Sequence, residues 1–185
     1  MALTPTKKIA LGFTAPDFEL PDAATGATIG LRQLRGKVAT VVMFICNHCP
    51  YVKHVQHGLV QLASDYIPKG VTFVAINSND AANYPEDAPD KMKEEIRKVG
   101  YPFPYLFDES QEVAKAYEAA CTPDFNIFDK DLKCVYRGQM DDSRPGNGIA
   151  VSGRDIRKAL DQLIAGGEVD TDQQPSVGCN IKWKE

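Results

Sequence analysis

The 185-residue sequence has no block of lysines and arginines, no long apolar run and no N-terminal leader pattern. Without a basic block, and with a net charge of -4, nucleic acid is not an expected partner. The longest apolar run, residues 38–45, is too short to span a membrane, so no membrane partner is expected either. The first residues lack the apolar core and the cleavage site of a secretion signal. We therefore expect a cytoplasmic protein.

The chain also lacks internal repeats and any linker rich in proline, glycine and serine. Apolar residues make up 43% of the sequence and charged residues 25%, as in ordinary globular proteins. We expect one domain over residues 1–185, with residues 166–185 as a C-terminal tail in which no helical or strand period is evident.

Cysteine is scarce and its number is odd. The five cysteines are Cys46, Cys49, Cys121, Cys134 and Cys179. An odd number excludes a fully paired disulfide framework, and a reducing cytosol favours free thiols or transient disulfides. We interpret Cys134, which lies in a strand-like segment, as a small buried hydrophobic residue.

Apolar periodicity outlines the secondary structure. Residues 37–45 and 71–79 are continuous β-branched stretches, typical of buried strands, and an apolar stripe between them predicts a helix over residues 50–67. The other expected elements are an early hairpin with its turn at Gly26, a helix ending at Gly100, a short strand at residues 105–108, a helix capped by Asp108, two strands joined by the turn at residues 129–131, and a helix capped by Ser152. This order predicts an α/β fold in which helices flank a mixed central sheet, with an N-terminal hairpin extension.

Two cysteines lie where the first of these buried strands leads into a helix, in the stretch "CNHCP". Pro50 suits the first position of a helix, which makes Cys49 the N-cap. A sulfur atom at this place lies near unpaired N–H groups and the positive end of the helix dipole, which favours the thiolate. We therefore predict that Cys49 attacks and that Cys46 is its partner, with His48 beside them. A C-x-x-C pair on such a turn indicates redox chemistry.

A second motif, Thr122–Pro123, precedes a predicted strand. Proline is tolerated at the first residue of a strand, and an X-Pro bond can be cis. We predict a cis bond that lies against Cys49. The backbone of Thr122 would then be free to pair with an extended substrate chain.

Several segments together resemble one family. They include "APDFEL", "LRGKVATVVMFICNHCP", "GVTFVAINSND", "VAKAYEAACTPDFNIFD" and "PSVGCNIKWK". These are similar to the peroxiredoxin-like redoxins of the thioredoxin fold (the AhpC/TSA-related group, peroxiredoxin-like 1 subgroup). The resemblance implies a thioredoxin-like fold, places Cys49–Pro50 at the attacking cysteine and its proline, and makes Thr122 and Pro123, with His48 and Pro50, the expected substrate contacts.

The sequence departs from peroxiredoxins at two positions. Cys46 stands where that family has a threonine, and Pro123 stands where it has an arginine that would help to hold the peroxide. The resemblance therefore implies slow peroxide turnover. The disulfide partner of Cys49 stays open among Cys46, Cys121 and Cys179.

Three functions are consistent with these residues. The first is a thiol–disulfide oxidoreductase that acts on a protein or small-molecule disulfide and is recycled by a thiol reductant. The second is a weak thiol peroxidase. The third is a metal-binding or copper-handling module using Cys46, His48 and Cys49. We favour the first, and expect an antioxidant role, no cofactor, no metal, and a monomer or homodimer.

Overall fold

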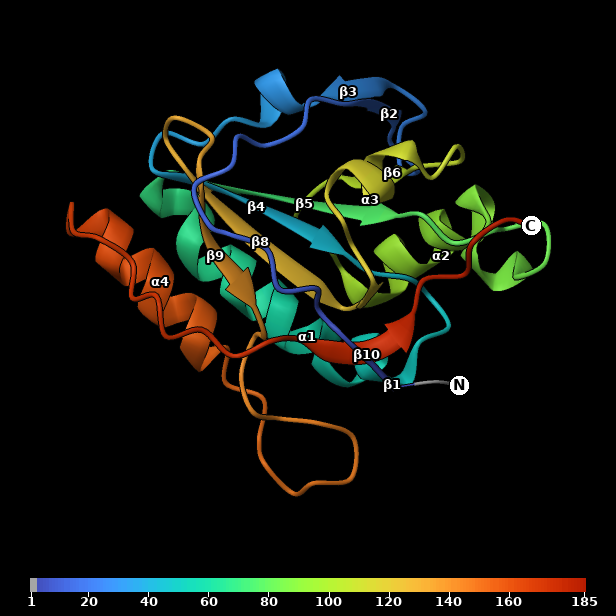
Figure 1. Ribbon diagram of the computed structural model, residues 1–185. Helices are drawn as coiled ribbons and strands as arrows, with labels where there is room; N and C mark the ends of the chain where they lie inside the picture. Colours follow the sequence, from blue (N-terminus) through green and yellow to red (C-terminus); the bar gives the residue numbers. More distant parts are fainter. Residues whose placement is uncertain (1–2) are drawn as a thin grey trace.

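The computed structural model describes residues 3–185. Its central sheet has five strands in the order β6-β5-β4-β8-β9, shown in Figure 1. The strands are β4 (Ala39–Phe44), β5 (Val71–Asn77), β6 (Tyr105–Phe107), β8 (Asp124–Asp129) and β9 (Cys134–Gly138). β4, β5 and β6 are parallel, whereas β8 runs antiparallel to β4 and β9 antiparallel to β8. The predicted mixed sheet is confirmed.

The central strand β4 is buried on both faces, which explains its continuous run of apolar residues. Successive side chains of a strand point to opposite faces. Ala39, Val41 and Met43 accordingly join one apolar cluster, and Val42 and Phe44 join another. The sheet thus separates two cores.

The helices divide between these two faces. α1 (Pro50–Tyr66), α2 (Pro89–Val99) and α4 (Arg154–Ile164) place their buried residues in the first cluster. α3 (Glu112–Ala116) and the 3-10 turn η1 (Leu31–Leu34) cover the other face, as Figure 1 shows. Two further 3-10 turns are η2 (Ile67–Lys69) and η3 (Pro85–Asp87).

Two small sheets lie beside the central one. β2 (Glu19–Pro21) and β3 (Thr28–Gly30) form the predicted N-terminal hairpin, and Gly26 in its turn has a φ of 76°. The other small sheet joins β1 (Leu3–Pro5), β10 (Val177–Asn180) and β7 (Cys121–Thr122), with β10 in the middle. The segment in which no strand period was evident therefore contains a strand.

Two helix starts differ from the expected ones. The helix expected to be capped by Asp108 begins at Glu112, because Gln111 has a left-handed φ of 65°. The Asp108 carboxylate instead accepts the N–H of Ala114 at 2.9 Å. α4 begins after Gly153, whose φ is 70°, and the Ser152 hydroxyl accepts the N–H of Arg154 at 3.2 Å.

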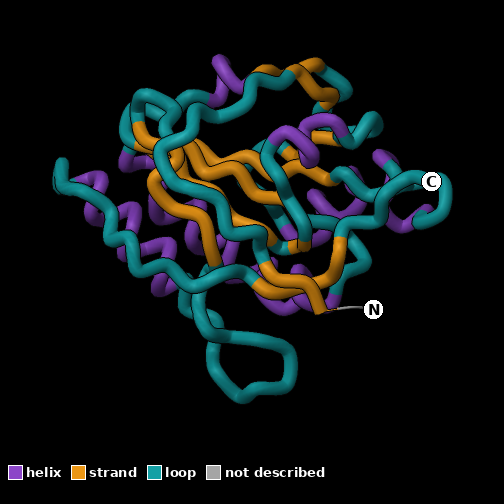
Figure 2. Tube along the Cα trace, viewed as in Figure 1, coloured by secondary structure: helices purple, strands orange, loops and turns teal. Residues whose placement is uncertain are grey.

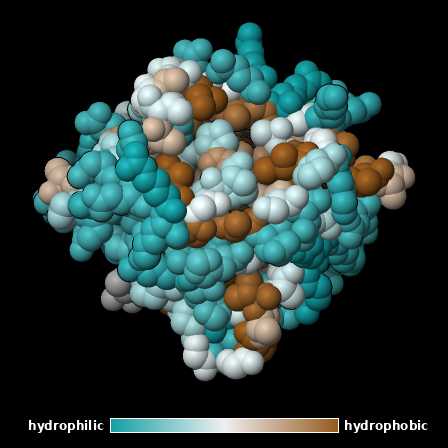
Figure 3. All heavy atoms as spheres, turned by 180° about the vertical axis from the view of Figure 1, so that it is seen from behind, coloured by the Kyte–Doolittle hydropathy of each residue, from teal (hydrophilic) through white to brown (hydrophobic). Residues whose placement is uncertain are grey.

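A long loop of residues 139–153 joins β9 to α4 and projects from the molecule (Figure 2). The reverse face of the molecule is mainly hydrophilic, with apolar groups scattered across it (Figure 3). Among residues 3–185, no helix combines the length and the apolar character needed to cross a membrane.

Candidate functional site

Cys49 lies at the junction of β4 and α1. It is the N-cap of α1, with extended backbone angles of φ -71° and ψ 122°, and Pro50 follows at the first helical position. The predicted N-cap is confirmed. Pro50 is exposed, whereas Cys46 and Cys49 are 1% and 0% exposed, so the thiol pair is covered rather than open to solvent.

Thr122 contacts both cysteines of the pair. Its hydroxyl oxygen lies 3.3 Å from Cys46 Sγ, and its carbonyl oxygen lies 3.3 Å from Cys49 Sγ. The sulfur of Cys179, on β10, lies 2.7 Å from the sulfur of Cys49. Three cysteines from two separate segments, the turn of residues 46–49 and β10, therefore meet around one threonine.

Hydrogen bonding from Cys46 lowers the pKa of Cys49 to about 5, and the Cys179 thiol and the N–H groups of Val52 and Cys179 act in the same direction against burial. The helix terminus was the expected cause; the neighbouring Cys46 thiol is the larger one. The pKa of Cys46 is raised well above its usual value, chiefly by that hydrogen bond to Cys49 and by burial. Burial, together with Cys49, raises the pKa of Cys179 to about 12. These shifts favour the thiolate at Cys49 and the protonated thiol at Cys46 and Cys179.

The peptide bond between Thr122 and Pro123 is cis, as predicted. The backbone of Thr122, however, is not free for a substrate chain. β7 pairs antiparallel with β10, and Thr122 lies opposite Cys179. The expectation of an open edge at Thr122 is therefore wrong, because the C-terminal segment of the chain itself pairs with that edge.

His48 belongs to a polar network beside the thiols. Its Nδ1 lies 2.5 Å from Oδ2 of Asp87, which is fully buried, and its ring stacks on Tyr84 with 5.5 Å between ring centroids. Asp87 also accepts the backbone N–H of Asn47 at 2.7 Å and the amide of Asn79 at 2.9 Å. The hydrogen bond to Asp87 raises the pKa of His48. This histidine is thus held in place and favours the imidazolium.

The alternative metal site has a different composition from the expected one. Cys46, His48 and Asp87 each offer one ligand atom, and these atoms lie within 4.8 Å of one another. The thiolate and the imidazole are soft and borderline ligands that suit zinc or copper, whereas the carboxylate is a hard ligand that zinc also accepts. His48 Nδ1 and Asp87 Oδ2, however, form a hydrogen bond with each other. A hydrogen-bonded network therefore accounts for the positions of both side chains without a metal.

Cys121 and Cys134 lie apart from the contact between Cys49 and Cys179. Cys121 is fully buried, and its sulfur is 4.0 Å from the Thr6 hydroxyl and 3.8 Å from the Pro123 carbonyl. Cys134 is 1% exposed within the second apolar cluster, as expected of a structural residue. Of the two additional candidates for resolving Cys49, the structure brings the sulfur of Cys179 into contact with it, whereas the sulfur of Cys121 contacts Thr6 and Pro123.

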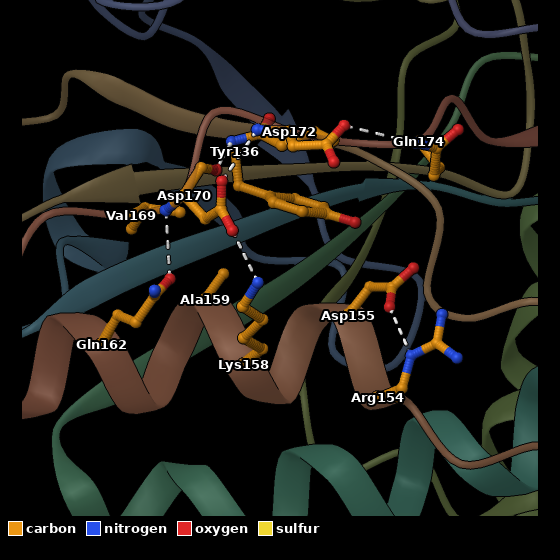
Figure 4. Close-up of a pocket in the computed structure, with 11 residues that line it drawn as sticks. Tyr136, Arg154, Asp155, Lys158, Ala159, Gln162, Val169, Asp170, Asp172 and Gln174 are labelled. Carbon is orange, nitrogen blue, oxygen red and sulfur yellow. Dashed lines mark hydrogen bonds and ion pairs between the residues drawn. The ribbon is translucent and has the colours of Figure 1, made fainter.

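A separate cavity of about 410 Å³ lies between α4 and residues 169–174 (Figure 4). Its charged groups pair with one another: Lys158 Nζ binds Asp170 at 2.6 Å, and Arg154 binds Asp155 at 2.8 Å. No cysteine lines it. We therefore place the candidate site at the cysteines and not in this cavity.

Asp87 and Asn79 are site residues that the sequence did not indicate. Asp87 lies in the loop "YPEDAPD", where an acidic residue next to prolines suggests a solvated turn. Asn79 lies two residues after the end of β5, at the same edge of the sheet as Cys46. A polar residue just after the carboxyl end of a parallel strand is the pattern that signals Asn79, whereas Asp87, in η3, has no such signal.

Comparison with known proteins gives relatives in sequence and in structure. The chain is 28% identical over 134 residues to the thiol-disulfide oxidoreductase ResA of Geobacillus kaustophilus, covering 71% of this chain and 72% of that protein. The solved structure of an uncharacterized conserved protein from Geobacillus kaustophilus superposes with a TM-score of 0.98 at 62% identity, over 100% of this chain and 97% of the other.

The thioredoxin domain of a thiol-disulfide oxidoreductase from Bacteroides vulgatus superposes with a TM-score of 0.61 at 18% identity, over 71% of this chain and 90% of the other. At that identity the likeness concerns the fold, and it confirms the predicted thioredoxin-like fold. The family model described as Redoxin matches residues 10–153, which include Cys46, Cys49, Thr122 and Pro123. The chain therefore belongs to the Redoxin family.

Proposed function

We propose that this protein is a thiol–disulfide oxidoreductase in which Cys49 is the nucleophile. The observation that carries the proposal is the position of the Cys49 thiolate, at a helix N-terminus and 2.7 Å from the sulfur of a second thiol, Cys179. Membership of the Redoxin family and the name of the ResA relative support oxidoreductase activity on thiol and disulfide substrates. A cytoplasmic location, and a monomeric or dimeric state, stay predictions.

The first step is the attack of the Cys49 thiolate on one sulfur of a substrate disulfide. A bond forms between Cys49 and that sulfur, while the other sulfur leaves with the bonding electrons and takes up a proton. Cys49 is mostly thiolate at neutral pH because its pKa is lowered to about 5. The product of this step is a mixed disulfide.

In the second step Cys179 attacks Cys49. The Cys179 thiol gives up its proton, its sulfur bonds to Cys49, and the substrate sulfur leaves with the electrons and that proton. Part of the raised pKa of Cys179 comes from the Cys49 thiolate, which no longer carries a charge in the mixed disulfide. Lys182 acts in the favourable direction, because its positive charge lowers the pKa of Cys179. Two equivalents of an external thiol then reduce the Cys49–Cys179 disulfide to two thiols and are themselves oxidised to a disulfide.

Cys46 has a different role in this scheme. The sequence favoured it as the resolving thiol, but the sulfur–sulfur contact of Cys49 at 2.7 Å is with Cys179, and Cys46 is suited to donate a hydrogen bond to the Cys49 thiolate. Thr122 completes the arrangement, because its hydroxyl lies 3.3 Å from Cys46 Sγ. We therefore propose that Cys46 tunes Cys49 and that Cys179 resolves it.

Thiol peroxidase activity is the second candidate. A peroxide would convert Cys49 to a sulfenic acid, and the adjacent Cys179 thiol would condense with it, releasing water and forming the same disulfide. The position of Cys179 favours that condensation, but no arginine replaces the one missing at Pro123. The buried guanidinium of Arg137 instead binds the carbonyls of Tyr117 and Glu118, each at 2.8 Å.

The test is a single turnover of the reduced protein with hydroxyethyl disulfide, a small disulfide. We expect each protein molecule to lose two thiols and release two mercaptoethanol molecules, and the Cys49→Ser variant to release none. Cys134→Ser is the matched control, because this cysteine is buried in the other core and should not change the yield. An unchanged yield in Cys49→Ser, or no reaction of the wild type, would contradict the proposal.

A further inference from the structure

The edge of β7 beside Cys49 is occupied by a strand of the same chain. Thr122 lies opposite Cys179 and Cys121 opposite Asn180 in antiparallel register. An extended partner that binds by strand addition needs a free row of backbone N–H and C=O groups. The backbone groups of β7 already pair with β10. β10 also brings the sulfur of Cys179 to Cys49, as a bound disulfide substrate would bring one of its own sulfur atoms.

The occupying strand fits this edge closely. A Cβ atom at position 178 would lie 2.0 Å from the Thr122 carbonyl oxygen and 3.3 Å from Pro123 Cδ, so only glycine allows this approach. On its other edge, β10 pairs with β1, where Leu3 lies opposite Cys179. The fit therefore requires glycine at position 178.

The chain beyond the strand is also fixed. The N–H of Ile181 donates to the Ala120 carbonyl at 3.1 Å, and the N–H of Lys182 donates to Asn79 Oδ1 at 2.8 Å. The buried Gln111 side chain donates to the Lys182 carbonyl at 2.8 Å and accepts the N–H of Lys184 at 2.9 Å. Residues 177–184 thus form a cover held at both ends, which we call the C-terminal cover.

The C-terminal cover shields the three cysteine thiols of the site from solvent. Cys49, Cys46 and Cys179 are 0%, 1% and 3% exposed. A polypeptide can pair with Thr122 only after β10 has left it, whereas a small disulfide needs only a local opening that uncovers the Cys49 sulfur. We propose that β10 is a resident substrate-like strand, which reserves Cys49 for small disulfides and excludes protein disulfides until the C-terminal cover detaches. This inference rests on the proposed function and names the substrate class of the same site.

The experiment compares two disulfides in single turnovers of the reduced protein: hydroxyethyl disulfide and the protein disulfides of insulin. The rate measured is the appearance of the mixed disulfide or of its resolved product after acid quenching. Gly178→Ala loosens the cover and keeps all five thiols. We expect it to raise the insulin rate about tenfold or more and to raise the hydroxyethyl disulfide rate by a clearly smaller factor, since insulin needs β10 to leave Thr122 whereas the small disulfide needs only a local opening at Cys49.

Two further variants make the result decisive. Gly167→Ala is the matched control in the same tail, because a Cβ there meets its nearest atom at an ordinary 3.4 Å. Gln111→Asn loosens the far end of the cover at a left-handed position that asparagine tolerates, and it decides the question if Gly178→Ala does not fold. Gln111→Asn should raise the insulin rate, as Gly178→Ala does.

The outcomes separate the two proposals. If wild type and variants react with neither disulfide, the proposed function fails. If hydroxyethyl disulfide reacts through Cys49 but insulin reacts at one rate in the wild type, Gly178→Ala and Gln111→Asn, the proposed function stands and the resident strand is overturned. A selective rise in the insulin rate in the loosened variants supports the inference.

Discussion

The carbonyl oxygen of Thr122 lies 3.3 Å from the sulfur of Cys49. This carbonyl accepts a hydrogen bond from the Cys49 thiol but cannot do so from the thiolate. Deprotonation of Cys49 therefore depends on the other groups around its sulfur, namely the thiols of Cys46 and Cys179 and the N–H of Val52. The reactivity of this site is a property of the cluster more than of one residue.

Alkylation by iodoacetamide should single out Cys49. Because its pKa is lowered to about 5, we expect the fast alkylation rate to be level above neutral pH and half-maximal near pH 5. Below that pH it should fall about tenfold per pH unit, since the thiolate is the reacting form. Mass spectrometry with time-resolved quenching measures this rate.

Substitutions of Cys46 and Cys49 identify which cysteine is alkylated fast and which neighbour lowers its pKa. Cys49→Ser should remove the fast phase, and Cys46→Ala should shift its midpoint to higher pH because the largest cause of the lowered pKa is lost. A fast, low-pKa thiol that survives in Cys49→Ser would show that we assigned the wrong nucleophile.

Mild oxidation should yield a disulfide between Cys49 and Cys179, because their sulfur atoms are 2.7 Å apart. Digestion with trypsin distinguishes a Cys49–Cys179 disulfide from a Cys46–Cys49 disulfide. Cys46 and Cys49 lie on one tryptic peptide, residues 38–53, and Cys179 lies on another, residues 159–182. A Cys49–Cys179 bond joins the two peptides, whereas a Cys46–Cys49 bond leaves the first peptide alone and lighter by two hydrogens.

Variants control the mapping. Cys121→Ser should leave the linked peptides unchanged, and Cys179→Ser should abolish them. Recovery of the internal bond in the wild-type protein would restore Cys46 as the resolving residue, as the sequence had suggested.

Reaction with hydrogen peroxide should be slower than reaction with hydroxyethyl disulfide at equal concentration. No threonine or arginine stands where peroxiredoxins use them, and Arg137 is fully engaged with Tyr117, Glu118 and Asn126. Single-turnover oxidation, followed by loss of the alkylatable Cys49 thiol, gives both rate constants. A larger rate constant for peroxide would reverse the order of the two candidate functions.

The pairing of His48 with Asp87 should make stability depend on pH. Asp87 raises the pKa of His48, so the folded state binds the proton more tightly than the unfolded state. The stabilisation is fully present below the unfolded value of about 6.5 and is lost as pH rises through the raised folded value. Urea unfolding of wild type and His48→Gln should therefore show a larger difference in the free energy of unfolding at pH 6 than at pH 9.

The same substitution at another histidine is the control for this pH effect. His57 is exposed on α1, so His57→Gln should change the free energy of unfolding little at either pH. An equal destabilisation of His48→Gln at pH 6 and pH 9 would mean that the ring acts through packing on Tyr84 and not through its charge.

Much of the fold could be predicted because its signals are local. The β-branched run at β4 reflects burial on both faces of the strand, and the apolar stripe of α1 reflects burial on one face of the helix. Pro50 marks the start of the helix directly. Helix α3 was misplaced because the left-handed φ of Gln111 has no local sequence signal; glycine, not glutamine, is usual there.

The site was predicted only where it is local in sequence. Cys46 and Cys49 share one turn, whereas Cys179 reaches them through a four-residue strand containing a glycine, which is too short to show a period. Its pairing with β1 and β7 is a long-range contact that no window of sequence reveals. Asp87 was missed for a related reason, because its burial depends on contacts with His48, Asn47 and Asn79.

The order in which the chain is synthesised gives this arrangement a consequence for the newborn protein. Ribosomes deliver the N-terminal part of a chain first, so the segment carrying Cys49 emerges long before the segment carrying Cys179. During that interval the nucleophilic cysteine has neither its nearest thiol nor the strand that covers it. Under the proposed function, the nascent chain therefore lacks the protection that the C-terminal cover gives Cys49 until residues 177–184 leave the exit tunnel and dock.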